Sequence, residues 1–138
     1  MFFDHCGCFR SQSCSFQKAI GSGFIGVAVP FHILRQVSQE ILLVPEISVA
    51  CPIDYPLGAG DKKVRQHESI VALKSGANCI DLSMSPYLFK KKSKAAIAKD
   101  IIPIYNICVD YNAELRVIIN YDLYDQKEAV DVCKILKD

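Results

Sequence analysis

Residues 49–85, VACPIDYPLGAGDKKVRQHESIVALKSGANCIDLSMS, decide the fold of this chain. The stretch opens on an apolar run, passes through a Pro- and Gly-rich turn into a helical pattern, and closes on a second apolar run. The two runs, Ile47–Ile53 and Cys79–Met84, are nearly continuous in hydrophobicity, which is typical of parallel strands covered on both faces. The stretch therefore predicts a strand, a helix and a second, parallel strand.

The same unit recurs on both sides of this stretch. Further β-rich runs lie at Phe24–Val29 and Leu115–Asn120, and helical spacing fills residues 12–20, 31–43, 61–75, 94–111 and 125–137. Strands that start at 24, 47, 79 and 115 leave room for one right-handed βα unit each. The pattern predicts four parallel βα units after a short first helix.

Particular residues predict where these helices begin and which faces they bury. Asp61 is a plausible N-cap for residues 61–75, and Asp125 with Glu128 has the spacing of a capping box. Pro103 is expected to kink the helix over 94–111 or to delay its start. In the helix over 61–75, the residues predicted to share one face are Val64, His67, Ile70, Val71 and Lys74.

Composition places the chain among intracellular α/β domains. Its 138 residues are 51% hydrophobic, and we divide them into a tail and short helix, 1–22, and the four βα units, 23–138. A formal charge of +1 argues against nucleic acid or a membrane as partner. The seven cysteines are an odd number, and four lie in apolar runs, so they are interpreted as reduced thiols in a cytoplasmic protein.

Two architectures share this order of elements. One is an open, doubly wound sheet, and the other is a (β/α)8 barrel, which typically needs about 250 residues. Length alone favours the open sheet, whereas the local motifs favour the barrel.

Two features carry possible chemistry. The segment Asp54–Asp61 is a tight βα loop whose backbone N–H groups either face a ligand or only form a turn. Asp81 is an acid inside an otherwise apolar strand, where an unpaired carboxylate would cost several kcal/mol. Acids held near the carboxyl ends of strands often transfer protons, although a structural hydrogen bond is an equal alternative.

Other polar residues give weaker signals. Lys90 is the lysine most able to reach a site, but its run with Lys91 and Lys92 is interpreted chiefly as a solvated loop. His32 and His67 are predicted at helix surfaces or in packing. The spacing of His5, Cys6, Cys8 and Cys14 matches no standard zinc site, so neither a metal nor another cofactor is predicted.

Two segments resemble the deoxyribose-phosphate aldolase family: residues 49–85 and 114–138, ELRVIINYDLYDQKEAVDVCKILKD. That family carries a strand ending in F/Y-P-x-G, a helix, a block GAD-E-V-D-h-V and later L-K-V-I-I-E. The resemblance runs from about Gly23 to Asp138 and is most specific over residues 49–83. It corresponds to the amino-terminal and central part of the family's barrel.

The resemblance implies a class I aldolase that works without a metal. Such enzymes reversibly cleave 2-deoxyribose 5-phosphate to glyceraldehyde 3-phosphate and acetaldehyde through a lysine Schiff base. The family's proton-shuttling aspartate matches Asp81, the single catalytic residue carried over. The Schiff-base lysine belongs to a block, F-x-K-T-S-T-G, that would follow Asp138, and Asn78, Asn120 and Val27 depart from the family's pattern. The resemblance therefore implies a scaffold that is inactive alone.

Four βα units leave a barrel incomplete, because closure takes about eight strands. We expect Leu82, Met84, Val117 and Ile119 to point inward and to need a cover. Four alternatives follow for this face. A second copy covers it in a 4+4 barrel, another protein chain covers it, the sheet flattens with the first helix across one face, or the remainder of a longer protein completes the barrel.

Two main functions remain. One is an aldolase acting on a phosphorylated sugar, with the lysines supplied by a missing half. The other is a non-catalytic, aldolase-like subunit of a larger assembly, and an open-sheet ligand-binding domain is third.

Overall fold

A single parallel sheet organises the computed structural model, which describes residues 11–90 and 94–137. Its strands follow the chain order β1-β2-β3-β4, and each neighbouring pair is parallel. The strands are β1 (Gly26–Ala28), β2 (Ser48–Ile53), β3 (Cys79–Ser83) and β4 (Glu114–Ile118). The predicted α/β class with four parallel βα units is confirmed.

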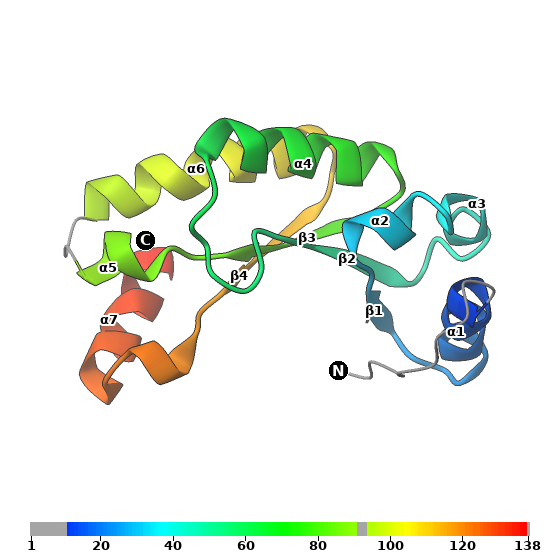
Figure 1. Ribbon diagram of the computed structural model, residues 1–138, viewed down its shortest axis with the longest axis horizontal. Coiled ribbons are helices and arrows are strands. Elements are labelled where there is room, and N and C mark those ends of the chain that lie inside the picture. The colour runs from blue at the N-terminus through cyan, green and yellow to red at the C-terminus, as the bar shows by residue number, and fades with distance from the viewer. Residues whose placement is uncertain (1–10, 91–93, 138) are drawn as a thin grey trace.

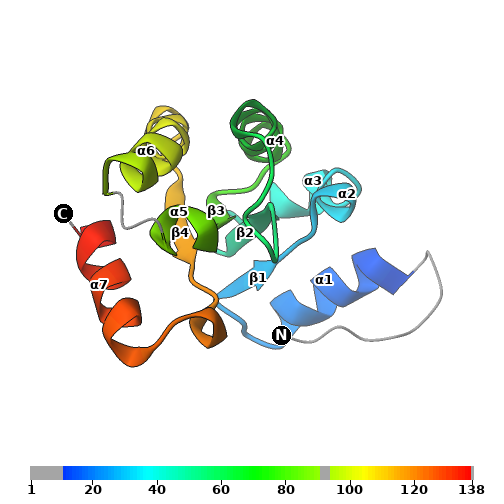
Figure 2. The ribbon, with the colours of Figure 1, turned by 60° about the vertical axis from the view of Figure 1, so that its left-hand side comes forward.

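The helices lie mainly on one face of this sheet. They are α1 (Ser11–Gly21), α2 (Phe31–Leu34), α3 (Ser38–Ile41), α4 (Lys62–Lys74), α5 (Pro86–Lys90), α6 (Lys94–Asp110) and α7 (Gln126–Lys137), with a 3-10 turn η1 (Tyr121–Leu123) before α7. Figure 2 shows α2, α3, α4 and α6 along the outer face, α7 continuing this row beside β4, and α1 beside β1. In Figure 1, α1 lies near the amino ends of the strands and α5 near their carboxyl ends.

The predicted helix starts are confirmed at two positions. The Asp61 carboxylate accepts hydrogen bonds from the backbone N–H of Lys63 at 2.8 Å and of Val64 at 3.4 Å. The Asp125 backbone N–H donates to Glu128 at 3.1 Å, and the Glu128 N–H donates back at 2.7 Å, which completes the capping box. Pro103 lies inside α6 and does not delay its start, because that helix begins at Lys94.

The single helix predicted over 31–43 is wrong. The chain forms two separate turns, α2 and α3, although Leu34, Val37 and Ile41 are all buried as the stripe requires. Between the turns, the Ser38 hydroxyl donates to the Arg35 carbonyl at 3.3 Å, a local bond that competes with continuous helix. The stripe predicted for this helix was Ile33, Leu34, Val37, Ile41 and Leu42. It is buried only in part, because Leu42 is 69% exposed, and the predicted helix length is wrong.

The buried face of α4 also differs from the prediction. Val64 is 53% exposed, and the buried residues of this helix are Arg65, Ser69, Ala72 and Leu73. Hydrophobicity alone could not select this face, because a buried arginine lies on it. Arg65 is accommodated by an acidic partner on the neighbouring helix α6.

The main core lies between the sheet and its helices. The strand residues in it alternate along each strand: Val49, Cys51, Ile53, Ile80 and Leu82. Side chains at the intervening positions point to the opposite face, hereafter the concave face. These positions are Gly26, Ala28, Ser48, Ala50, Pro52, Cys79, Asp81, Ser83, Glu114, Arg116 and Ile118.

The expectation that Leu82, Met84, Val117 and Ile119 point inward is therefore wrong. Leu82 and Met84 are 0% and 4% exposed, and Val117 and Ile119 pack against a second core cluster that holds Met84 and part of α7. Along each strand, the helices cover the alternate residues that the prediction had assigned to the inside of the barrel. Apart from Ile118, the concave face is consequently lined by small and polar side chains rather than by an apolar wall.

The register of the sheet is staggered. Ala28 pairs with Ala50, Ala50 with Cys79, and Cys79 with Glu114. The last residue of β1 is thus level with the first residue of β4. A stagger of this kind is what closing a sheet into a barrel requires.

No helix in the described ranges, 11–90 and 94–137, is long and apolar enough to span a bilayer. Within the same ranges, Cys51, Cys79, Cys108 and Cys133 are free thiols. The first three are buried, as is usual for cysteines in apolar runs, whereas Cys133 is exposed on α7.

Candidate functional site

Asp81 lies on the concave face of β3, and β4 positions its partner. Register pairs Asp81 with Arg116, so the two side chains meet across neighbouring parallel strands. Arg116 Nε lies 2.7 Å from Asp81 Oδ1, and Nη2 lies 3.1 Å from Oδ2. This forked pairing explains how an acid is tolerated within an apolar strand.

The ion pair is accessible from the concave side. The Asp81 side chain is 14% exposed and that of Arg116 is 49% exposed. The hydrogen bond to Asp81 raises the pKa of the Arg116 guanidinium above its usual range. A carboxylate fixed this way has both oxygens oriented and its charge neutralised, while one side stays open to solvent.

Two further polar groups of β3 share this face. Cys79 Sγ lies 3.8 Å from Asp81 Oδ1. The Ser83 hydroxyl is buried and has no hydrogen-bond partner among the described residues. A buried hydroxyl without a partner costs about 1–3 kcal/mol, so Ser83 provides an unused donor and acceptor two residues beyond Asp81. Sequence analysis missed Ser83, since a serine in a strand carries no distinctive signal.

The buried thiols are expected to resist alkylation. Burial raises the pKa of Cys51 and Cys79 to about 12 and that of Cys108 to about 11. At pH 8 roughly one Cys108 thiol in a thousand would be ionised, and fewer of the other two. Peptide mapping after iodoacetamide treatment should show exposed Cys133 modified in the folded chain and these three only on unfolding. Rapid labelling of Cys79 in the folded chain would contradict this assignment.

The same thiols predict an alkaline loss of stability. Each folded-state pKa lies above the ordinary value of 9.0, so the unfolded chain releases these protons first as the pH rises. The free energy of unfolding should therefore be unaffected by these groups below pH 9 and fall between about pH 9 and 12. Urea titrations at several pH values measure this fall.

The Asp54–Asp61 loop is fixed to the carboxyl end of the sheet. The Asp54 carboxylate accepts a hydrogen bond from the Gly60 N–H at 2.7 Å and closes the loop. Gly58 has a φ of +62°, and a Cβ there would lie 2.5 Å from the Met84 carbonyl oxygen. The loop therefore packs directly on the chain that leaves β3, which supports the turn interpretation of this segment.

A buried arginine cluster stabilises the same end of the sheet. Arg65, 2% exposed, donates to Asp100 Oδ2 at 2.7 Å and to the Ser83 carbonyl at 2.8 Å. Its Nε lies 3.4 Å from Asp54 Oδ2. One side chain thus connects α4, α6, β3 and the Asp54–Asp61 loop. The sequence analysis missed this cluster. Asp100 could have revealed it, because an acid stands there between Ile97 and Ile104 on the buried face of α6.

The remaining candidates are not brought to the concave face. His32 and His67 are exposed on α2 and α4, as predicted for surface residues. Lys90 is exposed at the end of α5. His5, Cys6, Cys8, Lys91 and Lys92 lie outside the described residues, and within them no cluster of metal-binding side chains is present.

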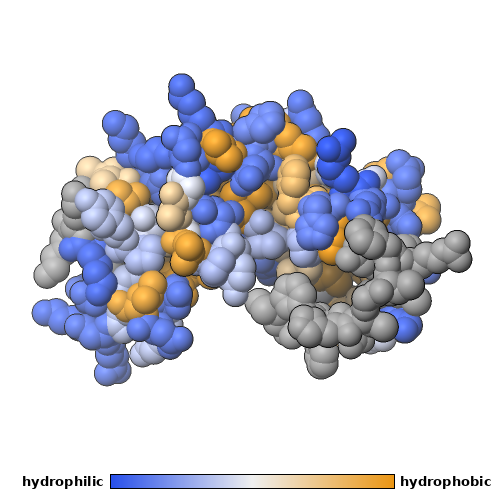
Figure 3. Space-filling model, viewed as in Figure 1, coloured by the Kyte–Doolittle hydropathy of each residue, from blue (hydrophilic) through white to orange (hydrophobic). Residues whose placement is uncertain are grey.

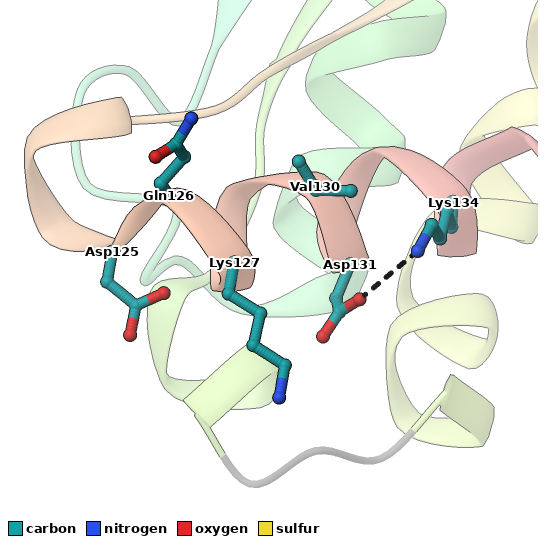
Figure 4. A pocket seen from close by; sticks show the side chains of 6 residues that line it. All are labelled: Asp125, Gln126, Lys127, Val130, Asp131 and Lys134. Atoms are coloured by element: carbon teal, nitrogen blue, oxygen red, sulfur yellow. Dashed lines mark ion pairs between the residues drawn. The ribbon is translucent and has the colours of Figure 1, made fainter.

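Surface hollows lie away from Asp81. One is formed by side chains of α7 and the residue before it, including the Asp131–Lys134 ion pair of 3.7 Å (Figure 4). A second, more apolar groove lies between the segment after β4 and α7, and we call it the α7 groove; its lining includes Ile119, Tyr121, Ala129, Val130 and Cys133. Over α4 and α6 the surface is mostly hydrophilic, with scattered apolar side chains (Figure 3).

The fold defines a class. Parallel βα units and a staggered register describe about half of a (β/α)8 barrel. Solved structures agree: an aldolase named QR15 matches 91% of this chain and 55% of its own with a TM-score of 0.81 and 20% identity. A putative deoxyribose-phosphate aldolase from Coccidioides immitis matches 96% of this chain and 51% of its own, with a TM-score of 0.84 and 19% identity.

Sequence comparison makes the class more specific. Over 88% of its length the chain is 29% identical to a deoxyribose-phosphate aldolase of Natranaerobius thermophilus and 27% identical to one of Thermococcus kodakarensis. The chain spans about half the length of these curated relatives, 54% in both cases. No family model matches the chain. The predicted resemblance to deoxyribose-phosphate aldolases is confirmed.

Proposed function

We propose that this chain is an aldolase-related half barrel that forms no Schiff base by itself. The position of its lysines supports this proposal. A Schiff-base lysine needs a site shielded from water beside the substrate. Every described lysine is exposed on a helix, and none lies on a strand: Lys18, Lys62, Lys63, Lys74, Lys90, Lys94, Lys99, Lys127, Lys134 and Lys137.

A second candidate function follows from the polar groups that the concave face retains. Asp81, proposed as the proton-transfer residue, is oriented by Arg116, and the Ser83 hydroxyl beside it lacks a partner among the described residues. This arrangement supports an active aldolase half that handles a phosphorylated sugar once another chain supplies the lysine. In that case Asp81 would move a proton through water at the reacting carbon.

Borohydride trapping separates the two candidates. The purified chain is incubated with 2-deoxyribose 5-phosphate or acetaldehyde and sodium borohydride, and peptides are examined by mass spectrometry. We expect no reduced adduct on any lysine and no release of glyceraldehyde 3-phosphate. The Thermococcus kodakarensis relative, a deoxyribose-phosphate aldolase by name, serves as the positive control.

Two outcomes would change the conclusion. A stoichiometric adduct on a lysine of this chain would overturn the proposed function. An adduct on a different polypeptide, found only when the tagged chain is isolated with its bound proteins, would support the second candidate. The free thiols of Cys51, Cys79, Cys108 and Cys133 support placing either function in the reducing cytoplasm.

A further inference from the structure

We propose that the outer face of α6 is an interface between two copies of this chain. The two α6 helices would pack antiparallel around a twofold axis near Tyr105. This inference goes beyond the proposed function and does not depend on it.

The outer face of α6 stays open however the barrel is completed. In a (β/α)8 barrel the helices form an outer ring, in which each helix packs beside those of the two neighbouring units. The neighbours of α6 in that ring are α4, which follows β2, and α7, which follows β4, and both belong to the described part of this chain. Figure 2 shows α6 between them. Strands and helices that complete the ring join it beyond β1 and β4, so they do not cover α6.

Apolar side chains stand exposed along this face without a charge among them. Ile102, Tyr105 and Val109 are 51%, 54% and 57% exposed, respectively. From position 101 to position 109 the helix carries no charged residue. The solvent face of a surface helix is ordinarily charged or polar. The middle of this face is therefore suited to packing against an apolar partner surface.

Opposite charges lie at the two ends of the same face. Lys99 and Asp110 are exposed, and neither forms an ion pair within residues 11–90 and 94–137. They are about three helical turns apart, which places them on one edge of the helix. The rise over those turns is about 16 Å, too far for the two side chains to pair within one copy. In an antiparallel pair of helices, Lys99 of each copy lies beside Asp110 of the other, which gives two ion pairs.

The apolar residues have the same symmetry as the charges. Ile102 and Val109 are about two turns apart, so the antiparallel arrangement places Ile102 of one copy beside Val109 of the other. This pair and the charged pair are both centred near Tyr105. The exposed Asn106 side chain would meet its own counterpart there, and a side-chain amide both donates and accepts hydrogen bonds.

This symmetry identifies the partner as a second copy. In a twofold interface the same patch is used on both subunits, so it must be complementary to itself when one copy is reversed. The outer face of α6 meets this condition with its charges and its apolar side chains at once. An unrelated partner would require neither the matching spacing nor the shared centre.

Sedimentation equilibrium tests the proposal. The wild-type chain should pass from its 15.4 kDa monomer to twice that mass in the micromolar range, because one pair of helices is a small interface. Lys99→Asp and Asp110→Lys each replace two attractive contacts with two repulsive ones, and each should weaken association about tenfold. Lys18→Asp is the matched control and should associate like the wild type, since Lys18 is exposed on α1, which lies beside β1.

Mixing the two charge variants excludes a folding defect or another interface as the cause. In a mixed dimer the two substituted residues lie side by side, and so do the two original ones, with opposite charges in each pair. The mixture should therefore associate about as tightly as the wild type, and so should the double variant Lys99→Asp with Asp110→Lys. A wild-type chain that stays monomeric at 100 μM would overturn the proposal. A dimer unaffected by both single variants, or a mixture no tighter than its components, would do the same.

Discussion

Replacing Arg65 by methionine is expected to lower the free energy of unfolding by about 3–5 kcal/mol. The substitution keeps most of the side-chain volume and removes the charge. Asp100, whose side chain is 3% exposed, would then be buried without its 2.7 Å partner, and the Ser83 carbonyl would lose its donor. Urea denaturation followed by circular dichroism measures the loss.

A double variant tests whether the charge is responsible. Arg65→Met combined with Asp100→Leu removes both members of the buried pair and leaves no buried charge between α4 and α6, because Lys62, which lies 3.9 Å from Asp100, is 46% exposed. Its stability should lie closer to that of the wild type than that of Arg65→Met alone, because apolar residues commonly replace a buried pair at little cost. If Arg65→Met alone stays within about 1 kcal/mol of the wild type, the cluster does not stabilise the fold.

Gly58→Ala should cost about 3 kcal/mol through two separate effects. The φ of +62° requires a left-handed conformation, which disfavours alanine by about 1–2 kcal/mol. The new Cβ would also lie 2.5 Å from the Met84 carbonyl oxygen, so the Asp54–Asp61 loop would have to move off the end of β3 at a similar cost. Thermal or urea unfolding of the variant measures the sum.

Gly23→Ala separates the two effects. Gly23 has a φ of +75°, but a Cβ there would meet no atom within 4 Å. This control should lose only the conformational part, about 1–2 kcal/mol. Equal losses in the two variants would show that the contact with Met84 contributes nothing.

Sequence patterns predicted the order of elements because each apolar run is long and strongly β-forming. They also predicted Asp61 and Asp125 as helix starts, since capping depends on residues only two or three positions away. They failed at residues 31–43, where the hydroxyl of Ser38 competes with the helix backbone. Hydrogen bonds between near neighbours decided both outcomes. The sequence predicted the bonds of the helix caps but not the Ser38 bond that separates α2 from α3.

The candidate site was predicted less completely, because it depends on register. Asp81 was identified as an unusual strand acid, but its partner Arg116 lies 35 residues away and is defined only by strand pairing. The strand register could not be read from the sequence, so the residues predicted to point inward, Leu82 among them, were also wrong. Arg65 was missed because a charged residue on a helix is ordinarily solvated.

The concave face, lined by Asp81, Arg116 and mostly small side chains, has a consequence for the handling of the chain in water. A face of this kind carries no large apolar patch among the described residues and is wetted readily, so it should not drive aggregation.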